Sequence, residues 1–248
     1  MILSLNGLAR HVAAILALGI ALPTCAATLI HYYNFEAGVV DQVGASNGIL
    51  RGGANVLGGT LNLNGLDAFA EFDTAIIPRS GSFSIDFNAK QLEPAGGYIE
   101  IISQGNNCLC FYVGASPTRN IRVGDAWVPS GIDVGPVGVW TNYAVVSDLT
   151  ADTTSLYING SLAADINFAV PSGGPRTRFG SQYGDFGLGG SEFFPGAIDD
   201  VRVYSGALTA GEVALLTVPE APTYLMCILG LGIIATRRSR GISTTKQC

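Results

Sequence analysis

Short segments in which apolar and polar residues alternate recur along most of this 248-residue chain. Residues 82–89, SFSIDFNA, place large apolar side chains at every second position, which is the pattern of a strand with one buried face. No helical periodicity precedes Thr209. The chain is therefore predicted to be all-β, folded as an antiparallel two-sheet sandwich or jelly roll.

The other predicted strands are rich in β-branched and aromatic residues and recur at intervals of about 8–12 residues. Two of them flank Asn159 and Gly160, a pair that favours a type I′ hairpin because both of its central positions need φ > 0. These predicted strands are residues 29–35, 60–64, 68–73, 98–103, 109–114, 121–124, 139–147, 155–158, 161–166 and 197–204.

One short helix is predicted after the last strand. Gly206 ends that strand, and Thr209 with Glu212 forms the capping-box pattern of a helix N-terminus. Val213 and the leucines after it would pack inward. A strand followed by a capped helix indicates that one domain, over residues 28–217, finishes here.

Residues 1–27 have the composition of a secretory signal peptide. Arg10 precedes an apolar run over residues 12–22, and small residues end at Ala27, where signal peptidase would cleave. A membrane anchor would need about 20 apolar residues, and this run has eleven. Lipid attachment at Cys25 is a weaker alternative, because the residues before it form a poor lipobox.

Residues 218–248 form a tail with three parts. A turn-forming motif at 218–222 is followed by an apolar segment at 223–236 and a basic cluster at 237–240. The apolar segment has fourteen residues, which is short for a permanent membrane span, so a plain anchor and a removable sorting segment both stay open. The motif residues are Pro219, Glu220, Pro222, Arg237, Arg238 and Arg240.

The charge of the predicted domain excludes some partners. Residues 28–217 contain eight Lys and Arg against 18 Asp and Glu, a net charge of −10. Nucleic acid is not an expected partner, because binding to phosphates needs clustered basic residues. Acidic loops suit calcium or uncharged polar ligands such as glycans. The domain's two cysteines, Cys108 and Cys110, have a spacing that favours buried thiols over a disulfide.

Residue sets for common hydrolytic chemistry are missing from this region. His31 is its one histidine, and Glu71 with Asp73 lacks the second glutamate that a glycosidase pair needs. Asp199 and Asp200 are adjacent on a predicted strand, so they are expected to point to opposite faces. We therefore expect no enzymatic activity.

A ligand site is predicted in the glycine-rich stretch 181–194, where aromatic and acidic residues alternate. Aromatic faces suit the C–H face of a sugar, and carboxylates suit its hydroxyls. The alternative is a rim loop whose aromatic residues are partly buried. The candidate ligand residues are Tyr183, Asp185, Phe186 and Glu192, with Trp127 as a second wall.

Several of these motifs together resemble a known family. The ending FPGAIDDVRVY, followed by ALTAGE, is similar to the end of LamG-like (laminin G, concanavalin A-like) jelly-roll domains. The segments LNLNG, AFAEF, SFSIDF, WTNYAVVSD and SLYINGSL fall in the order and spacing of that family, so the resemblance covers residues 30–216. It implies a domain used for binding more often than for catalysis. It also implies one structural Ca²⁺ between the first and last strands, held by Glu36 and Asp199, with loop carbonyls and Asp41 completing the set.

The tail resembles a PEP-CTERM sorting signal, although Ala221 stands where that signal has its second proline. This resemblance implies an exosortase-type enzyme as partner and a transient stay of the tail in the membrane. The whole chain is thus expected to be an exported bacterial surface or extracellular-matrix protein with a non-catalytic adhesion domain. The alternatives are a glycosidase-like carbohydrate-active enzyme and a released sugar-binding lectin.

Overall fold

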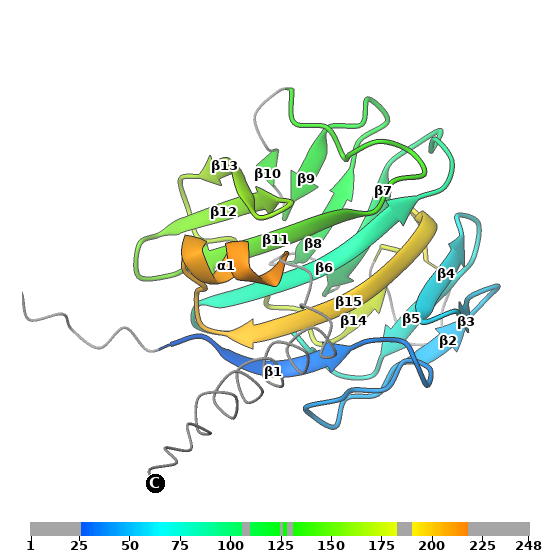
Figure 1. The fold of residues 1–248 in the computed structure, drawn as a ribbon, viewed down its shortest axis with the longest axis horizontal. Helices are drawn as coiled ribbons and strands as arrows, with labels where there is room; N and C mark the ends of the chain where they lie inside the picture. Colours follow the sequence, from blue (N-terminus) through cyan, green and yellow to red (C-terminus); the bar gives the residue numbers. More distant parts are fainter. Residues whose placement is uncertain (1–25, 106–109, 125, 128–130, 183–189, 218–248) are drawn as a thin grey trace, which may run out of the picture.

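Two antiparallel sheets lie face to face and form a β-sandwich (Figure 1). The structure is a computed structural model, and it describes residues 26–105, 110–124, 126–127, 131–182 and 190–217. The predicted all-β, two-sheet architecture is confirmed. Most of the predicted signal peptide and the whole of the tail at 218–248 lie outside the described residues.

The eight-stranded sheet has the order β13-β12-β11-β6-β15-β4-β3, and β1 pairs with β15 beside this path. Its strands are β1 (Thr28–Tyr33), β3 (Asn55–Leu57), β4 (Thr60–Asn64), β6 (Phe83–Gln91), β11 (Thr141–Asp148), β12 (Thr153–Ile158), β13 (Ser161–Ile166) and β15 (Pro195–Ser205).

The seven-stranded sheet has the order β10-β9-β8-β7-β14-β5-β2. Its strands are β2 (Ile49–Arg51), β5 (Phe69–Phe72), β7 (Ile99–Gln104), β8 (Phe111–Ala115), β9 (Ile121–Val123), β10 (Ala126–Trp127) and β14 (Thr177–Phe179).

Each predicted strand overlaps a strand of the structure. The strands that the sequence did not indicate are β2, β3, β10 and β14, each of two or three residues, which is too short for alternation to be seen. Asn159 and Gly160 have φ values of 50° and 75°, so the predicted hairpin between β12 and β13 is confirmed.

The core between the sheets contains an aromatic cluster around Phe179 of β14. Its ring lies 4.7 Å from that of Phe72, 5.6 Å from that of Tyr33 and 6.5 Å from that of Phe35, measured between centroids. Phe72 belongs to the seven-stranded sheet and Tyr33 to the eight-stranded sheet. The cluster therefore joins the two layers through edge-to-face contacts.

The helix α1 (Ala210–Leu216) covers part of the outer face of the eight-stranded sheet, in front of β11 and β6 in Figure 1. Its one buried residue, Val213, packs in a small second cluster that includes Tyr204 and Leu208. The predicted capping box is confirmed, because Thr209 and Glu212 each accept a hydrogen bond from the other's backbone N–H.

Within the described part of the chain, no helix has the length and apolar character needed to cross a membrane.

Of the two cysteines expected to be buried thiols, Cys110 is a buried free thiol, while Cys108 lies outside the described residues.

Phe179→Ala should lower the free energy of unfolding by about 3–5 kcal/mol, because it leaves a cavity where the two sheets meet. Guanidinium unfolding followed by tryptophan fluorescence would measure this loss. The matched control is Phe168→Ala, whose side chain is exposed and whose replacement should change stability by no more than about 0.5 kcal/mol. Equal effects of the two substitutions would contradict the assigned core.

Candidate functional site

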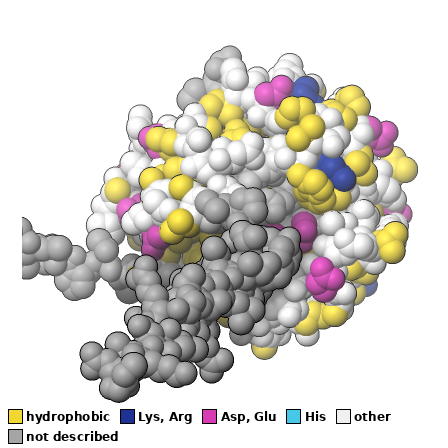
Figure 2. Space-filling model, viewed as in Figure 1, with side chains coloured by type: hydrophobic (Ala, Val, Ile, Leu, Met, Phe, Trp, Pro, Cys, Tyr) yellow, Lys and Arg dark blue, Asp and Glu magenta, His cyan; other side chains and the backbone are white. Residues whose placement is uncertain are grey.

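An open groove of about 850 Å³ lies on the outer face of the eight-stranded sheet, beside the end of α1. Along β6 and β11 its polar residues alternate with residues buried in the core, so the period of two brings the polar ones to one surface. Where grey atoms do not cover the face drawn in Figure 2, the basic side chains in view do not gather into a large patch, in agreement with the acidic composition.

Three polar residues form a row across the floor of this groove. Asn142 of β11 lies opposite Asn88 of β6, and Asn88 lies opposite Asp199 of β15. Because neighbouring strands are about 4.8 Å apart, the backbone positions of Asn142 and Asp199 are separated by roughly 10 Å. The row therefore presents amide and carboxylate groups across three adjacent strands.

Asp199 and Asp200 both line the groove, so the expectation that they point to opposite faces was wrong. The pairing of β15 with β6 shifts register between Asp199 and Arg202, and Asp200 has a φ of 54°. A β-bulge of this kind interrupts the alternation of side chains, and aspartate tolerates the left-handed region better than most residues. Sequence alternation alone could not show the bulge.

Asp200 is held by two neighbours. The Tyr32 hydroxyl donates to its Oδ1 at 2.6 Å, and Arg202 Nη2 donates to the same oxygen at 3.2 Å. Arg202 also lies 4.7 Å from the centre of the Tyr32 ring and donates through Nη1 to Asp86 Oδ2 at 3.4 Å. The positive charge of Arg202 is thus already shared between two carboxylates.

Asp199 has no ion-pair partner among the described residues. Its Oδ1 accepts a hydrogen bond from the backbone N–H of Asp200 at 2.7 Å. Burial, and next the negative charge of Asp200, raise the pKa of Asp199 to about 6. This carboxylate is therefore ionised at neutral pH in a position where the protein's own charges oppose ionisation.

Asn142 is a buried residue with one unsatisfied atom. Its Nδ2 donates to Asp86 Oδ1 at 2.8 Å and to Asn88 Oδ1 at 3.2 Å. Its Oδ1 is buried and has no hydrogen-bond partner among the described residues, although the side chain lines the groove. A buried polar atom of this kind is costly unless a ligand or a water satisfies it.

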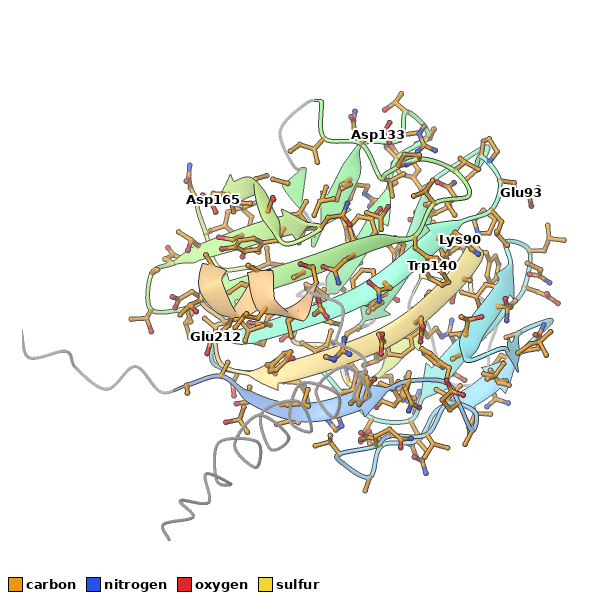
Figure 3. All side chains as sticks on the ribbon, in the orientation of Figure 1. Lys90, Glu93, Asp133, Trp140, Asp165 and Glu212 are labelled. Atoms are coloured by element: carbon orange, nitrogen blue, oxygen red, sulfur yellow. The ribbon has the colours of Figure 1, made fainter. Side chains whose placement is uncertain are left out.

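An exposed aromatic ring stands at one side of the groove. Trp140 comes immediately before β11 and is 40% exposed. The ammonium of Lys90 lies 4.9 Å from the centre of its ring, and Figure 3 shows the two side chains together near the end of β6. The groove therefore combines an accessible indole with the polar row.

The ligand residues predicted in the stretch 181–194 are described only in part. Tyr183, Asp185 and Phe186 lie outside the described residues, as does the side chain of Trp127. Glu192 is described: its carboxylate accepts from Arg122 Nη1 at 3.1 Å. These residues therefore remain a prediction, with Glu192 already engaged in an ion pair.

Glu192 belongs to a cluster on the other sheet that the sequence did not indicate. Glu100 of β7 is fully buried, and burial followed by the charge of Glu192 raises its pKa to about 8. The Arg122 guanidinium lies 4.7 Å from the centre of the Tyr98 ring. Beside this cluster is a second open cavity of about 490 Å³, lined in part by Tyr98, Glu192 and Phe193.

The three predicted calcium ligands do not form one cluster. The Asp41 carboxylate is engaged by its own loop, where it accepts from His31 Nδ1 at 2.6 Å and from several backbone amides, two of them those of Gly44 and Ser46. Glu36 lies near enough to Asp199 to raise its pKa. No group of three acidic, histidine or cysteine side chains able to hold a metal ion is found among the described residues. Two carboxylates are fewer than the six to eight oxygens that calcium takes, so the described residues do not fit this ion well.

The groove was not predicted from the sequence, although the sequence contains part of its signal. The segments SFSIDFNA and WTNYAVVSD show Asn88 and Asn142 at polar positions of predicted strands. Which strands are neighbours, and in what register, depends on pairing between distant segments, so the row could not be assembled from the sequence.

Asp200→Asn should lower the pKa of Asp199 from about 6 toward that of an ordinary aspartate, because it removes the neighbouring negative charge. The asparagine can still accept the Tyr32 hydrogen bond. Carboxyl ¹³C NMR titration would measure the change. Asp165→Asn, on β13 four strands away, should leave it unaltered. An Asp199 titration that is the same in both variants would contradict the electrostatic account.

Solved structures of low sequence identity share this fold. Domain 4 of AbnA, an extracellular arabinanase from Geobacillus stearothermophilus in complex with arabinotriose, has a TM-score of 0.57 and 21% identity, with 78% of this chain and 100% of that chain covered. Trypanosoma rangeli sialidase in complex with sialic acid has a TM-score of 0.60 and 16% identity, covering 76% and 32%. A heptameric SAP-like pentraxin from Limulus polyphemus has a TM-score of 0.54 and 16% identity, covering 66% and 83%. At these identities the likeness shows the fold alone.

No curated protein sequence matches the chain. The family model Laminin_G_3 matches residues 64–214, which is more than half of the chain and extends from the end of β4 into α1. The matched region includes the bulged strand and the capped helix from which the resemblance was first drawn. The chain therefore belongs to the concanavalin A-like lectin/glucanases superfamily, with a Laminin_G_3 domain.

Proposed function

We propose that this chain is an exported carbohydrate-binding protein that holds a glycan in the groove on the eight-stranded sheet. The observation behind this proposal is the exposed Trp140 ring beside the row of Asn142, Asn88 and Asp199. An aromatic face packs against the C–H groups of a sugar ring, while amide and carboxylate groups bind its hydroxyls.

The similar structures support a ligand of this class. Domain 4 of AbnA was solved in complex with arabinotriose, and its whole length is covered by the likeness to this chain. The groove is also open along the sheet, which suits a chain of sugar units better than a small enclosed cofactor.

The proposed role is binding without catalysis. The fully buried Glu100 gives a substrate no access, and Asp200 is held by Tyr32 and Arg202. A second candidate, a glycosidase, is favoured by one observation: Asp199 and Asp200 share a face and differ in environment, as paired catalytic carboxyls do. The appearance of shorter products after incubation with a bound oligosaccharide would support this second candidate.

The proposal includes export and sorting at the cell envelope. Signal peptidase removes residues 1–27, and the tail at 218–248 holds the chain in the membrane until an exosortase-type enzyme cleaves near Pro219, Glu220 and Pro222. The protein then acts at the cell surface or in the extracellular matrix, where it binds a glycan or another matrix component. The sequence patterns at the two ends support this part of the proposal.

Trp140→Ala should weaken glycan binding about tenfold or more, because it removes the stacking face of the groove. Screening the full chain on a glycan array and then titrating the best ligand by calorimetry would measure the loss. Phe168→Ala, which also removes an exposed aromatic ring, should leave the affinity unchanged. Equal affinity of the two variants would place the ligand elsewhere, and the loop residues Trp127, Tyr183, Asp185, Phe186 and Glu192 would be tested next.

Thermal unfolding of the full chain in Ca²⁺ and in EGTA tests the structural calcium, which stays a prediction. An ion held by Glu36, Asp199 and Asp41 should raise the melting temperature in Ca²⁺. An identical melting temperature in the two conditions would remove calcium from the proposal.

Replacing Pro219, Glu220 and Pro222 by alanine should leave the tail attached to the exported chain, because the proposed cleavage motif is lost. Mass spectrometry of the protein recovered from cells would show residues 223–248 retained in the variant and removed from the unsubstituted chain. Removal of the tail from both chains would contradict the proposed cleavage motif.

A further inference from the structure

The groove contains one unsatisfied hydrogen-bond acceptor and one carboxylate without a counter-ion, and these two groups indicate which glycans it prefers. The acceptor is the Oδ1 of Asn142, a residue that is 8% exposed. The carboxylate is that of Asp199, which has no ion-pair partner among the described residues and accepts a backbone hydrogen bond from Asp200. Both side chains line the groove and belong to the same row across β11, β6 and β15.

The cation nearest to Asp199 is already engaged elsewhere. Arg202 donates to Asp200 at 3.2 Å and to Asp86 at 3.4 Å, and its guanidinium packs against the Tyr32 ring. Lys90 lies over the Trp140 ring, two residues along β6 from Asn88. The described residues therefore leave the Asp199 end of the groove negative and the Trp140 end neutral or positive.

We infer that the groove selects glycans with free, protonated amino groups, such as polymers of glucosamine. An ammonium group donates three hydrogen bonds and has a positive charge, so it satisfies a carboxylate that the protein leaves unpaired. A neutral sugar hydroxyl can donate to Asn142 but cannot neutralise Asp199. Another ring of the same glycan packs against the exposed Trp140 at the other end of the groove.

This inference rests on the proposed function, since it names the ligand class of the same groove. The choice of an amino sugar over a lysine-containing peptide follows from the groove itself. Asn88 lies next to Asp199 and Asn142 lies next to Asn88, each at the spacing of adjacent strands. Both amides offer acceptors and donors to ring hydroxyls, which a lysine side chain lacks.

The test compares two trisaccharides that differ only at the amino group: the β-1,4-linked glucosamine trimer and its N-acetylated form. Calorimetric titration of the full chain at pH 7 and low salt should give about tenfold tighter binding of the free amine, the gain expected from one charge-assisted hydrogen bond. Asp199→Asn should abolish this preference, so that the two trimers bind with about the same affinity.

Two further variants, Asp165→Asn and Asp199→Glu, serve as controls for the loss of charge at Asp199. Asp165→Asn makes the same change of charge on β13, four strands from Asp199, and should keep the full preference. Asp199→Asn removes a carboxylate whose ionisation the protein opposes and can still accept from the Asp200 N–H, so its melting temperature should not fall. Asp199→Glu restores the charge and should recover part of the preference.

The other outcomes would contradict the amino-group preference alone or the proposed glycan binding as well. Equal affinity for the two trimers overturns the amino-group preference and leaves glycan binding in place. No binding of either trimer, with other glycans bound on the array, overturns the preference in the same way. No glycan bound at all overturns the proposed function as well. A trilysine peptide that binds as tightly as the glucosamine trimer, and loses affinity in Asp199→Asn, would show an amine site that does not recognise sugar.

Discussion

The pairing of β15 with three other strands is the constraint on which the eight-stranded sheet depends. β15 lies between β6 and β4, and β1 pairs with its C-terminal half. One face of the strand buries Ile198, Val201 and Val203 in the core. Core packing therefore sets the position of β15 relative to the seven-stranded sheet. The other face forms the floor of the groove. A strand with so many partners cannot shift register without disrupting both sheet faces.

The bulge in β15 places two adjacent carboxylates on the groove side of the strand. Between Asp199 and Arg202 one extra residue brings adjacent aspartates to the same surface, while Ile198 and Val201 on either side stay in the core. The local electrostatics follow from that geometry, because the two carboxylates lie close together and Arg202 pairs with Asp200 and Asp86. The raised pKa of Asp199 is therefore a consequence of backbone conformation and burial together.

The two sheets differ in how deeply the polar and charged side chains discussed above are buried. In the seven-stranded sheet Arg178 and Glu71 are both almost completely buried and lie 2.6 Å apart, and Glu100 is buried beside Arg122 and Glu192. These groups are covered by other parts of the protein and stabilise a particular arrangement only while their partners stay in place. The groove on the eight-stranded sheet leaves Asn88, Asp199 and Asp200 partly exposed, which is why binding is assigned there.

Much of the architecture followed from local signals in the sequence. Alternation in SFSIDFNA, the Asn159 and Gly160 turn, and the capping box of Thr209 and Glu212 each act over a few residues, and each is found in the structure. Strands of two or three residues, such as β14, were missed because alternation needs more positions than they contain. Their place depends on partners far along the chain.

The sequence by itself thus determined the fold class, the closing strand and helix, and the family to which the chain belongs, because hydrophobic period, turns and caps are local properties. Only the tertiary structure decided that Asn142, Asn88 and Asp199 form one row and that Asp199 and Asp200 share a face. The physical reason is that strand register and a β-bulge arise from hydrogen bonding between segments distant in the chain, and side chains from different strands meet only after that pairing is made.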